Sequence, residues 1–96
     1  MNFNKKVYGL CRKIPKGKIS TYKILSKKLN SKAYRAVGNA LNKNKSREVP
    51  CHRVIKSSGK IGGFAKGTKT KIKLLKKEGI IIRNNKIDLK KYLYKF

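Results

Sequence analysis

The balance of charge is the strongest constraint on how this chain can fold. Lys and Arg number 28 among 96 residues, Asp and Glu number only 3, and the formal net charge is +25. The acids Glu48, Glu78 and Asp88 cannot neutralise this excess, so any fold must carry positive charge on almost every side. A chain of this length forms one domain around a single modest core. The charge favours a polyanion as partner, bound in a strongly salt-dependent way; a Lys-rich composition without functional meaning is the alternative.

The two cysteines, Cys11 and Cys51, lie in a chain with no segment that predicts secretion or membrane insertion. The apolar run after the first lysines is too short for a signal peptide, and no stretch is long enough to cross a bilayer. We therefore expect a cytoplasmic protein whose thiols stay reduced. Cys51 stands directly before His52 and only Cys11 is left over, which falls short of the spacing of a structural zinc site. We expect no metal and no cofactor.

Apolar residues at helical spacing, with turn residues between them, predict the secondary structure. Ser20 or Thr21 can cap the second helix, and Gly79 is suited to end the last one. The first predicted helix covers residues 3–13, and the second runs from the cap at Ser20 or Thr21 to about residue 29. Two further helices are predicted over about 32–42 and over 68–78, followed by a hairpin that pairs 80–82 with 87–89.

Two of the predicted helices are separated only by the polar residues Asn30 and Ser31. Short helices joined by a tight polar turn are typical of a helix-turn-helix. The fold class expected for residues 1–96 is therefore one mainly α domain with a short β hairpin, similar to a winged helix-turn-helix DNA-binding domain.

The segment Pro50-Cys51-His52-Arg53 places a thiol beside an imidazole in a strongly basic chain. A free cysteine, with a pKa of about 8.5, is only a few per cent thiolate near neutrality, so a neighbouring base or a positive field is the usual way to activate it. Taken alone, such a dipeptide in a small protein more often reflects packing or chance than catalysis. Its surroundings must decide between a nucleophile and a structural residue.

Short motifs follow one another in a characteristic order along the chain. They are Ile14-Pro15-Lys16-Gly17, Thr21-Tyr22, Arg35-Ala36-Val37-Gly38-Asn39-Ala40, Asn44, Pro50-Cys51-His52-Arg53-Val54-Ile55, Ser58-Gly59, Gly62-Gly63-Phe64, Lys71, Leu74-Leu75 and Glu78-Gly79. Over residues 7–89 this order resembles the O6-alkylguanine-DNA alkyltransferases, or methylated-DNA–protein-cysteine methyltransferases, and specifically their C-terminal, active-site domain. Most members carry a further N-terminal domain, which we expect to be absent here.

The resemblance implies a chemistry for five residues. Cys51 would take the alkyl group from O6 of guanine by direct displacement and would not be regenerated, so the enzyme would act once. His52 would accept the thiol proton through a bound water, and Glu78 would orient that imidazole. Glu78 ends a predicted helix, where the macrodipole disfavours a carboxylate, which favours a role in the site. Tyr22 would donate a proton to the departing guanine, and Asn44 would hold the turn before the active-site strand.

The resemblance also implies how DNA is bound. Guanine O6 lies within the duplex stack, so the nucleotide must be turned out of the helix, and Arg35 would take its place. Small side chains allow a helix to sit in the minor groove, which carries little sequence code. The expected partner is double-stranded DNA, bound by a monomer with no membrane contact. The expected DNA-binding residues are Thr21, Tyr22, Ala33, Tyr34, Arg35, Ala36 and Gly38; those expected to line the alkylguanine pocket are Leu41, Val54, Phe64 and Ala65.

The sequence departs from the family pattern in two places. The hinge after Asn44 has the polar residues 45–48, one residue fewer than usual, where relatives commonly have Asn-Pro and an apolar run. Phe64 and Ala65 stand where many members have Tyr and Ser, so hydrogen bonds from those side chains to guanine would be lost. We expect a weaker grip on the base, or a changed choice of alkyl group.

Three functions are compatible with these observations. The first is a suicide alkyltransferase for DNA repair. The second is a non-catalytic, alkyltransferase-like lesion-binding protein; in those relatives the cysteine is replaced, commonly by Trp, so Cys51 disfavours this reading. The third is a general basic nucleic-acid binder, which would depend neither on Cys51 nor on damage in the DNA.

Overall fold

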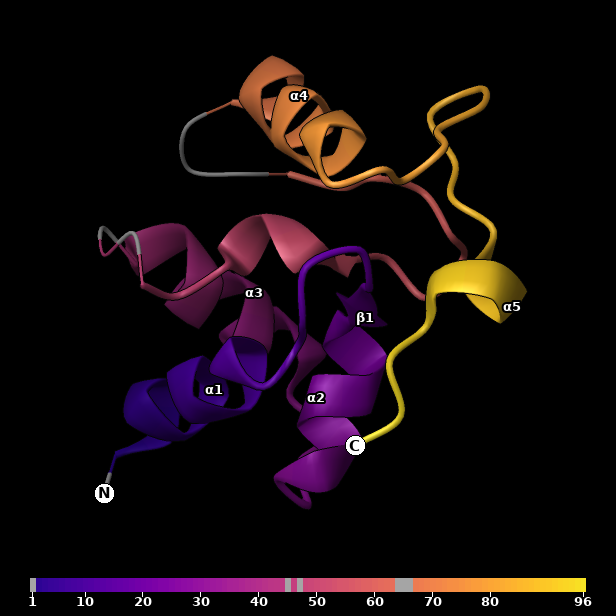
Figure 1. The fold of residues 1–96 in the computed structure, drawn as a ribbon. Helices are drawn as coiled ribbons and strands as arrows, with labels where there is room; N and C mark the ends of the chain where they lie inside the picture. Colours follow the sequence, from indigo (N-terminus) through magenta and orange to yellow (C-terminus); the bar gives the residue numbers. More distant parts are fainter. Residues whose placement is uncertain (1, 45, 47, 64–66) are drawn as a thin grey trace.

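Short helices dominate the fold in this computed structural model, which describes residues 2–44, 46, 48–63 and 67–96 (Figure 1). The elements in chain order are α1 (Phe3–Arg12), β1 (Ser20–Thr21), α2 (Tyr22–Lys28), α3 (Tyr34–Lys43), the 3-10 helix η1 (Cys51–Arg53), β2 (Val54–Ile55), α4 (Thr68–Lys77) and α5 (Leu89–Tyr92). The prediction of a mainly helical domain is confirmed. The arrangement of α2 and α3 is consistent with a helix-turn-helix.

The predicted ends of the helices follow from local chemistry. Thr21 caps α2, because its Oγ1 accepts a hydrogen bond from the Ile24 amide at 3.1 Å. Asn30, with φ of 53°, takes the left-handed conformation after α2, and Gly79, with φ of 87°, does so after α4. Both predicted helix stops are therefore confirmed.

The only sheet among the described residues is a parallel pair of two-residue strands, which sequence reasoning did not predict. β1 pairs with β2 in the register Ser20 with Val54 and Thr21 with Ile55. This pairing brings the start of α2 next to the segment that follows Cys51. The sheet therefore brings Tyr22 and Cys51, two predicted site residues that are far apart in the sequence, into the same region of the fold.

The predicted hairpin is correct at its turn and wrong in its arms. Arg83 and Lys86 form an antiparallel bridge, and Asn84 and Asn85, with φ of 52° and 58°, make the tight turn between them. Beyond the turn, Ile87 donates its amide to the carbonyl of Gly59 at 2.9 Å instead of pairing with residues 80–82. Asp88 then caps α5 by accepting from the Lys90 amide at 3.0 Å, so a helix replaces the second arm.

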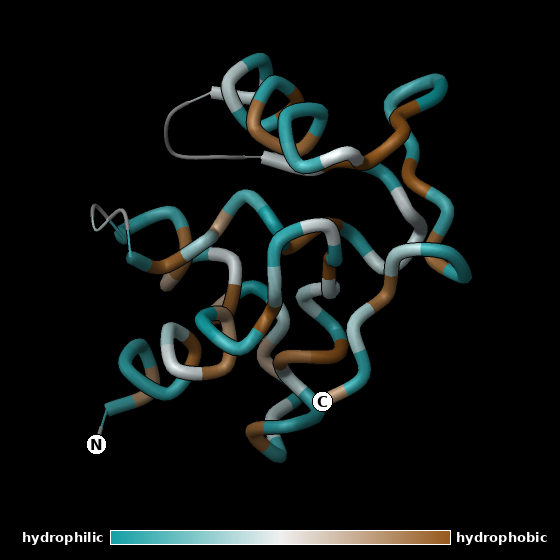
Figure 2. The backbone as a smooth tube through the Cα atoms, viewed as in Figure 1, coloured by the Kyte–Doolittle hydropathy of each residue, from teal (hydrophilic) through white to brown (hydrophobic). Residues whose placement is uncertain are grey.

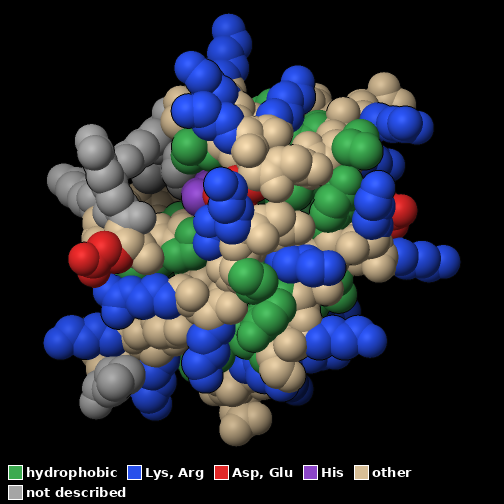
Figure 3. All heavy atoms as spheres, viewed as in Figure 1, with side chains coloured by type: hydrophobic (Ala, Val, Ile, Leu, Met, Phe, Trp, Pro, Cys, Tyr) green, Lys and Arg blue, Asp and Glu red, His purple; other side chains and the backbone are tan. Residues whose placement is uncertain are grey.

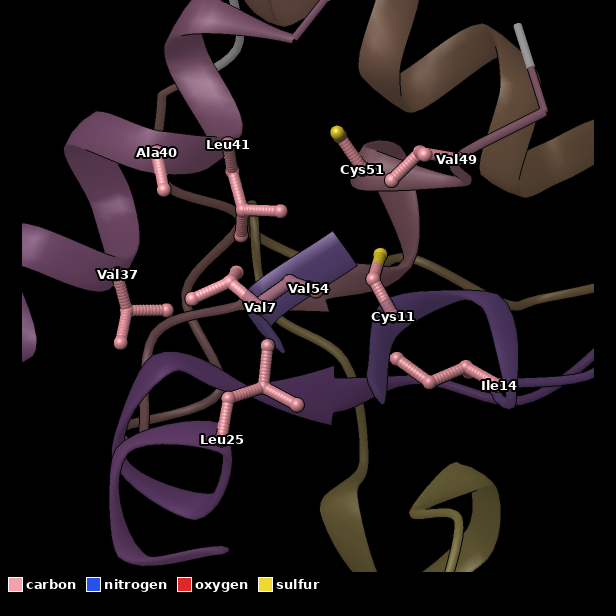
Figure 4. Packing of buried hydrophobic residues seen from close by; sticks show 10 residues of the cluster. All are labelled: Val7, Cys11, Ile14, Leu25, Val37, Ala40, Leu41, Val49, Cys51 and Val54. Carbon is pink, nitrogen blue, oxygen red and sulfur yellow. The ribbon is translucent and has the colours of Figure 1, made fainter. Parts of the chain in front are cut away.

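The buried side chains form two clusters that meet at β2. The first, whose side chains Figure 4 shows, joins α1, α2, α3 and η1, and the second packs α4 against the C-terminal segments. Figure 2 shows how hydrophobic and hydrophilic residues alternate along the backbone. Val54 belongs to the first cluster and its neighbour Ile55 to the second, as expected from the alternating faces of a strand. Each fully buried aliphatic side chain contributes about 1.5–3 kcal/mol. η1, which carries Cys51, lies between α4 and the group formed by α1, α2 and α3 (Figure 1).

The surface carries Lys and Arg side chains on all sides of the face shown in Figure 3. Glu48 is 84% exposed and lies 3.9 Å from Arg12, so it forms a weak surface pair, whereas the Glu78 side chain is only 9% exposed. Over the part of the chain that the structure describes, no helix has the length and apolarity required to span a bilayer.

Candidate active site

The Cys51 thiol lies at the edge of the first core cluster and is 7% exposed (Figure 4). The pKa of Cys51 is lowered, and its largest cause is the neighbouring Cys11 thiol; burial opposes the shift, while the Asn44 amide and the Lys71 ammonium add to it. The pKa of Cys11 is raised, first by Cys51 and then by burial. Of the two thiols, Cys51 is therefore the one that ionises, and Cys11 stays protonated.

Asn44 ends α3 and connects the polar hinge to the thiol. Its Nδ2 lies 3.0 Å from Cys51 Sγ and donates also to the carbonyl of Ser46 at 3.0 Å, while its Oδ1 accepts from the Ser46 amide at 3.1 Å. One side chain thus fixes the turn and supplies a hydrogen bond that stabilises a thiolate. Lys45 and Arg47, in the same hinge, lie outside the described residues.

His52, Arg53 and Glu78 form a partly buried charged cluster beside Cys51. His52 Nε2 lies 2.7 Å from Glu78 Oε2. Arg53 binds the same carboxylate in a fork, with Nε donating to Oε1 and Nη2 to Oε2, both at 2.9 Å. The third guanidinium nitrogen, Nη1, donates to the carbonyl of Ile14 at 2.8 Å. Glu78 is therefore held by η1 from one side, and η1 is tied to the loop after α1.

Burial opposes the ionisation of Glu78, but hydrogen bonds from Arg53 and His52 together outweigh it, so the pKa of Glu78 is lowered. Glu78 is a carboxylate at neutral pH and can only accept hydrogen bonds. His52 therefore presents an N–H to Glu78. Between described residues, no direct hydrogen bond joins the imidazole to Cys51, so a proton passing from the thiol to His52 needs a water.

Tyr22 and Lys71 meet beside β2. Lys71, on α4, is completely buried, and its Nζ lies 2.7 Å from the carbonyl of Val54 and 3.4 Å from the hydroxyl of Tyr22. The Tyr22 hydroxyl is also 3.5 Å from the carbonyl of Gly63. Phe64 and Ala65 themselves lie outside the described residues.

The predicted DNA-binding residues of α3 are largely on the surface. Tyr34 is 44% exposed, and Ala33 and Arg35 beside it are exposed, whereas Ala36 and Gly38 are half-buried. The starts of α2 and α3 also border a cleft of ≈ 410 Å³, lined by Tyr22, Lys23, Tyr34, Lys56, Ser57 and Ser58. A basic cleft with two tyrosines offers both phosphate contacts and stacking surfaces.

Three predicted contact residues have little exposed surface. Thr21 is 2% exposed and its hydroxyl caps α2, so the side chain is engaged within the protein. Leu41 is 4% and Val54 0% exposed, because both pack in the same core cluster as Cys51. Leu41 and Val54 therefore pack beneath the thiol and expose little surface to a bound base.

Sequence reasoning assigned no role to Arg53, Lys71 or Cys11 in the site. Lys71 carried a signal that could have revealed it, because it shares one helical face with Leu75 and Glu78 and therefore points inward. Arg53 follows His52 directly, but its fork on Glu78 requires the tertiary fold. Cys11 is fully buried in the same core cluster as Cys51, and the two thiols interact there.

The fold and the site define a basic helix-turn-helix domain built around a buried thiol with an adjoining His-Glu-Arg cluster. Residues 2–80 match the family described as 6-O-methylguanine DNA methyltransferase, DNA binding domain. The chain belongs to this family.

The relatives include both longer proteins and one of similar size. A bifunctional methyltransferase/endonuclease of Picrophilus torridus is 42% identical over 90 residues, which make up 92% of this chain and 30% of that protein. A methylated-DNA–protein-cysteine methyltransferase of Sulfolobus acidocaldarius is 45% identical over 82 residues, or 84% of this chain and 52% of that one. The chain thus spans about a third to a half of the length of these relatives.

Solved structures give the same fold. S. pombe Atl1, in complex with damaged DNA containing O6-carboxymethylguanine, has a TM-score of 0.88 at 32% identity, covering 98% of this chain and 95% of that chain. The O6-methylguanine-DNA methyltransferase of Pyrococcus kodakaraensis KOD1 has a TM-score of 0.75 at 40% identity, covering 83% of this chain and 47% of that chain.

Proposed function

We propose that this chain is the active-site domain of a DNA repair alkyltransferase, equivalent to the C-terminal domain of longer relatives. It turns O6-alkylguanine out of duplex DNA and transfers the alkyl group irreversibly to Cys51. The observation that carries the proposal is the arrangement of a buried thiol, bound by Asn44 at 3.0 Å, directly before a His52–Glu78 pair at 2.7 Å. A cysteine that served only to fill the core would require neither partner.

The reaction proceeds by displacement at the alkyl carbon. The Cys51 proton passes through a water to His52, whose positive charge Glu78 balances, and Arg53 keeps the carboxylate in place. The sulfur–carbon bond forms as the bond from carbon to O6 breaks. Tyr22 gives a proton to the guanine as it departs. Cys51 ends as an S-alkylcysteine, so each molecule reacts once.

DNA approaches the start of α3 in this proposal. Tyr34 and Arg35 are exposed there on a short helix whose neighbouring residues are small. Arg35 fills the stack when the nucleotide leaves it, and the binding site is the minor groove, read without base specificity. Turning out a damaged base costs a few kcal/mol, less than for an undamaged pair. The likeness to proteins solved with DNA supports DNA as the partner. We further propose that the protein acts as a monomer inside the cell.

A second candidate is a lesion-binding protein without transfer activity. The likeness to S. pombe Atl1 over 98% of this chain and 95% of that chain favours it. Cys51, with its lowered pKa and its neighbours, is the observation against it. The two candidates differ in what happens to the DNA, since a binding protein leaves the alkyl group in place.

The test is the fate of a duplex oligonucleotide with one O6-methylguanine, mixed with increasing protein. We expect chromatography of the digested DNA to show unmodified guanine appearing in proportion to the protein added, and conversion to stop at one lesion per molecule. Continued turnover, or tight binding with intact O6-methylguanine at every protein concentration, would contradict the proposal.

Arg35→Ala is expected to slow methyl transfer from duplex DNA by at least about tenfold, because losing the group that replaces the flipped base raises the barrier by 1.4 kcal/mol or more. Transfer from free O6-methylguanine should change less than about twofold, since no flipping is required. Single-turnover rates on both substrates measure this. Arg83→Ala removes an equal charge from an exposed turn and serves as the matched control. Equal losses on both substrates would refute the role of Arg35.

A further inference from the structure

The C-terminal segment forms a pocket that the proposed function does not use. The described residues that line this cavity of ≈ 400 Å³ all fall between 81 and 92; they are Ile81, Arg83, Lys86, Ile87, Asp88, Lys91 and Tyr92. The match to the family ends at residue 80, so each of them lies beyond it. In Figure 1 this segment and α5 lie on the right, away from α3, the helix proposed to bind DNA. The C-terminal pocket is therefore separate from the candidate active site.

Ile81 presents an exposed aliphatic side chain at this pocket. It is 49% exposed, whereas Ile80 before it is buried in the second core cluster. The only other large hydrophobic side chain that is exposed among the described residues is Tyr34, which the proposed approach of DNA explains. A single exposed isoleucine is ordinary on a protein surface, but Ile81 borders a hollow whose other apolar walls are Ile87 and Tyr92. A ligand with an apolar side chain would cover it.

Backbone hydrogen bonds fix the walls of the pocket. Arg83 donates its amide to the carbonyl of Lys86 at 3.0 Å, and Lys86 donates to that of Arg83 at 2.9 Å. The Ile61 amide donates to the carbonyl of Asn85 at 3.1 Å, which ties this turn to the segment after β2. The Ile81 amide donates to the Tyr92 hydroxyl at 3.1 Å, which ties it to α5. A preformed pocket of this kind needs little ordering when a ligand binds.

The rim of the pocket is positively charged. Arg83, Lys86 and Lys91 are exposed, and none of the three forms an ion pair within the part of the chain that the structure describes. Asp88 is the acidic side chain of the lining, and its Oδ1 accepts an amide hydrogen bond at the start of α5. Three cations and one carboxylate leave a local charge of +2. The Lys91 Nζ lies 5.4 Å from the centre of the Tyr92 ring, so this cation stands beside an apolar wall.

We propose that the C-terminal pocket binds an acidic segment of another protein. An apolar side chain of that segment covers Ile81, and carboxylates on either side of it pair with Arg83, Lys86 and Lys91. Duplex DNA would satisfy the cations, but its phosphate backbone has no side chain for the apolar walls. A second copy of this chain is disfavoured by repulsion, because each carries a net charge of +25. The inference goes beyond the proposed function and does not depend on alkyl transfer.

Fluorescence anisotropy with a synthetic peptide tests this proposal. The probe is a labelled peptide of about 12 residues in which one Leu and one Phe are flanked by Glu and Asp, titrated at about 0.15 M salt. Because the whole surface is basic, the reference is a peptide of equal charge with Ser in place of Leu and Phe. We expect this Ser peptide to bind the wild type at least about tenfold more weakly. Equal affinities would mean that general charge alone attracts the probe, and would overturn the proposal.

Two substitutions locate the binding site on the protein. Ile81→Ser keeps the net charge and should weaken binding of the Leu-Phe peptide at least about fivefold. Lys86→Glu should weaken it at least about tenfold, whereas the matched control Lys28→Glu, the same reversal of charge on the exposed surface of α2, should weaken it less than about threefold. An affinity that Ile81→Ser leaves unchanged, or that both charge reversals reduce equally, would contradict the proposal.

Undamaged duplex DNA is titrated against the same variants, because it is the competing occupant. We expect Lys86→Glu and Lys28→Glu to reduce the affinity for the duplex to the same extent, within about twofold. A loss of duplex affinity confined to Lys86→Glu would assign the pocket to DNA and overturn the proposal.

Amide NMR of the wild type provides a readout that does not depend on the stability of any variant. The Leu-Phe peptide should shift the amide signals of Ile81, Ile87 and Lys91, while the signals of α3 stay in place. Shifts confined to α1, α2 or α3 would contradict the proposal. None of these measurements involves methyl transfer, so a failure of the proposed function would leave their outcome unaffected.

Discussion

Cys51→Ser is expected to reduce methyl transfer from duplex DNA by at least about a thousandfold, because a serine hydroxyl is not ionised at neutral pH and is a weak nucleophile without an adjacent base in contact. The substitution keeps the size of the side chain within the core cluster and leaves α3, the helix proposed to bind DNA, unchanged. Affinity for the lesion-containing duplex should therefore stay within about threefold of wild type. Single-turnover kinetics and fluorescence titration measure the two quantities.

The matched control for Cys51→Ser is the other cysteine. Cys11→Ala removes a thiol from the same cluster and should keep transfer within about tenfold of wild type, since Cys11 lowers the pKa of Cys51 but is not the proposed acceptor. If the Cys51→Ser protein still demethylated the duplex, or if the Cys11→Ala protein did not, Cys51 would not be the acceptor.

Glu78→Ala is expected to destabilise the domain by about 3 kcal/mol at pH 7, because it leaves the partly buried Arg53 and His52 without their shared carboxylate. This is a large part of the stability of a domain of this size. Urea denaturation measures the change. Glu48→Ala is the control, since its carboxylate is 84% exposed and pairs weakly with Arg12; it should hardly alter stability.

The pH dependence of this effect has a definite sign. The pKa of Glu78 is lowered from its ordinary value of 4.5, so the folded state favours the carboxylate. Its stabilising contribution is present above pH 4.5 and is lost as the pH falls through the lowered pKa of the folded state. The difference in unfolding free energy between wild type and Glu78→Ala should shrink over that acidic range. A difference that stays constant down to the lowest pH would mean that Glu78 acts through packing alone.

The helices could be predicted from the sequence because their determinants are local. The Thr21 cap, the left-handed Asn30 and Gly79, and apolar residues at helical spacing all act within a few residues. The parallel pair of Ser20–Thr21 with Val54–Ile55 could not be predicted, since two-residue strands show no alternation. The prediction of the hairpin arms was wrong because the amide of Ile87 bonds to the carbonyl of Gly59 and because Asp88 caps a helix.

Some residues of the candidate site could likewise be predicted from the sequence, and others could not. Cys51, His52 and Glu78 could be named because the order of motifs resembles a known family, and the fold brings His52 and Glu78 together. The fork of Arg53 on Glu78, the hydrogen bonds of Lys71 and the neighbouring Cys11 thiol depend on contacts between α1, η1 and α4, which no local pattern encodes. Phe64 and Ala65 remain predictions, because they lie outside the described residues.

The central claim is that the Cys51 sulfur accepts the alkyl group, and peptide mass spectrometry after reaction with O6-methylguanine in duplex DNA tests it most directly. We predict that the peptide containing Cys51 gains the mass of one methylene group, that the peptide containing Cys11 stays unchanged, and that no molecule carries a second addition. A methyl group on Cys11, or an unmodified Cys51 in protein that has demethylated its DNA, would contradict the account.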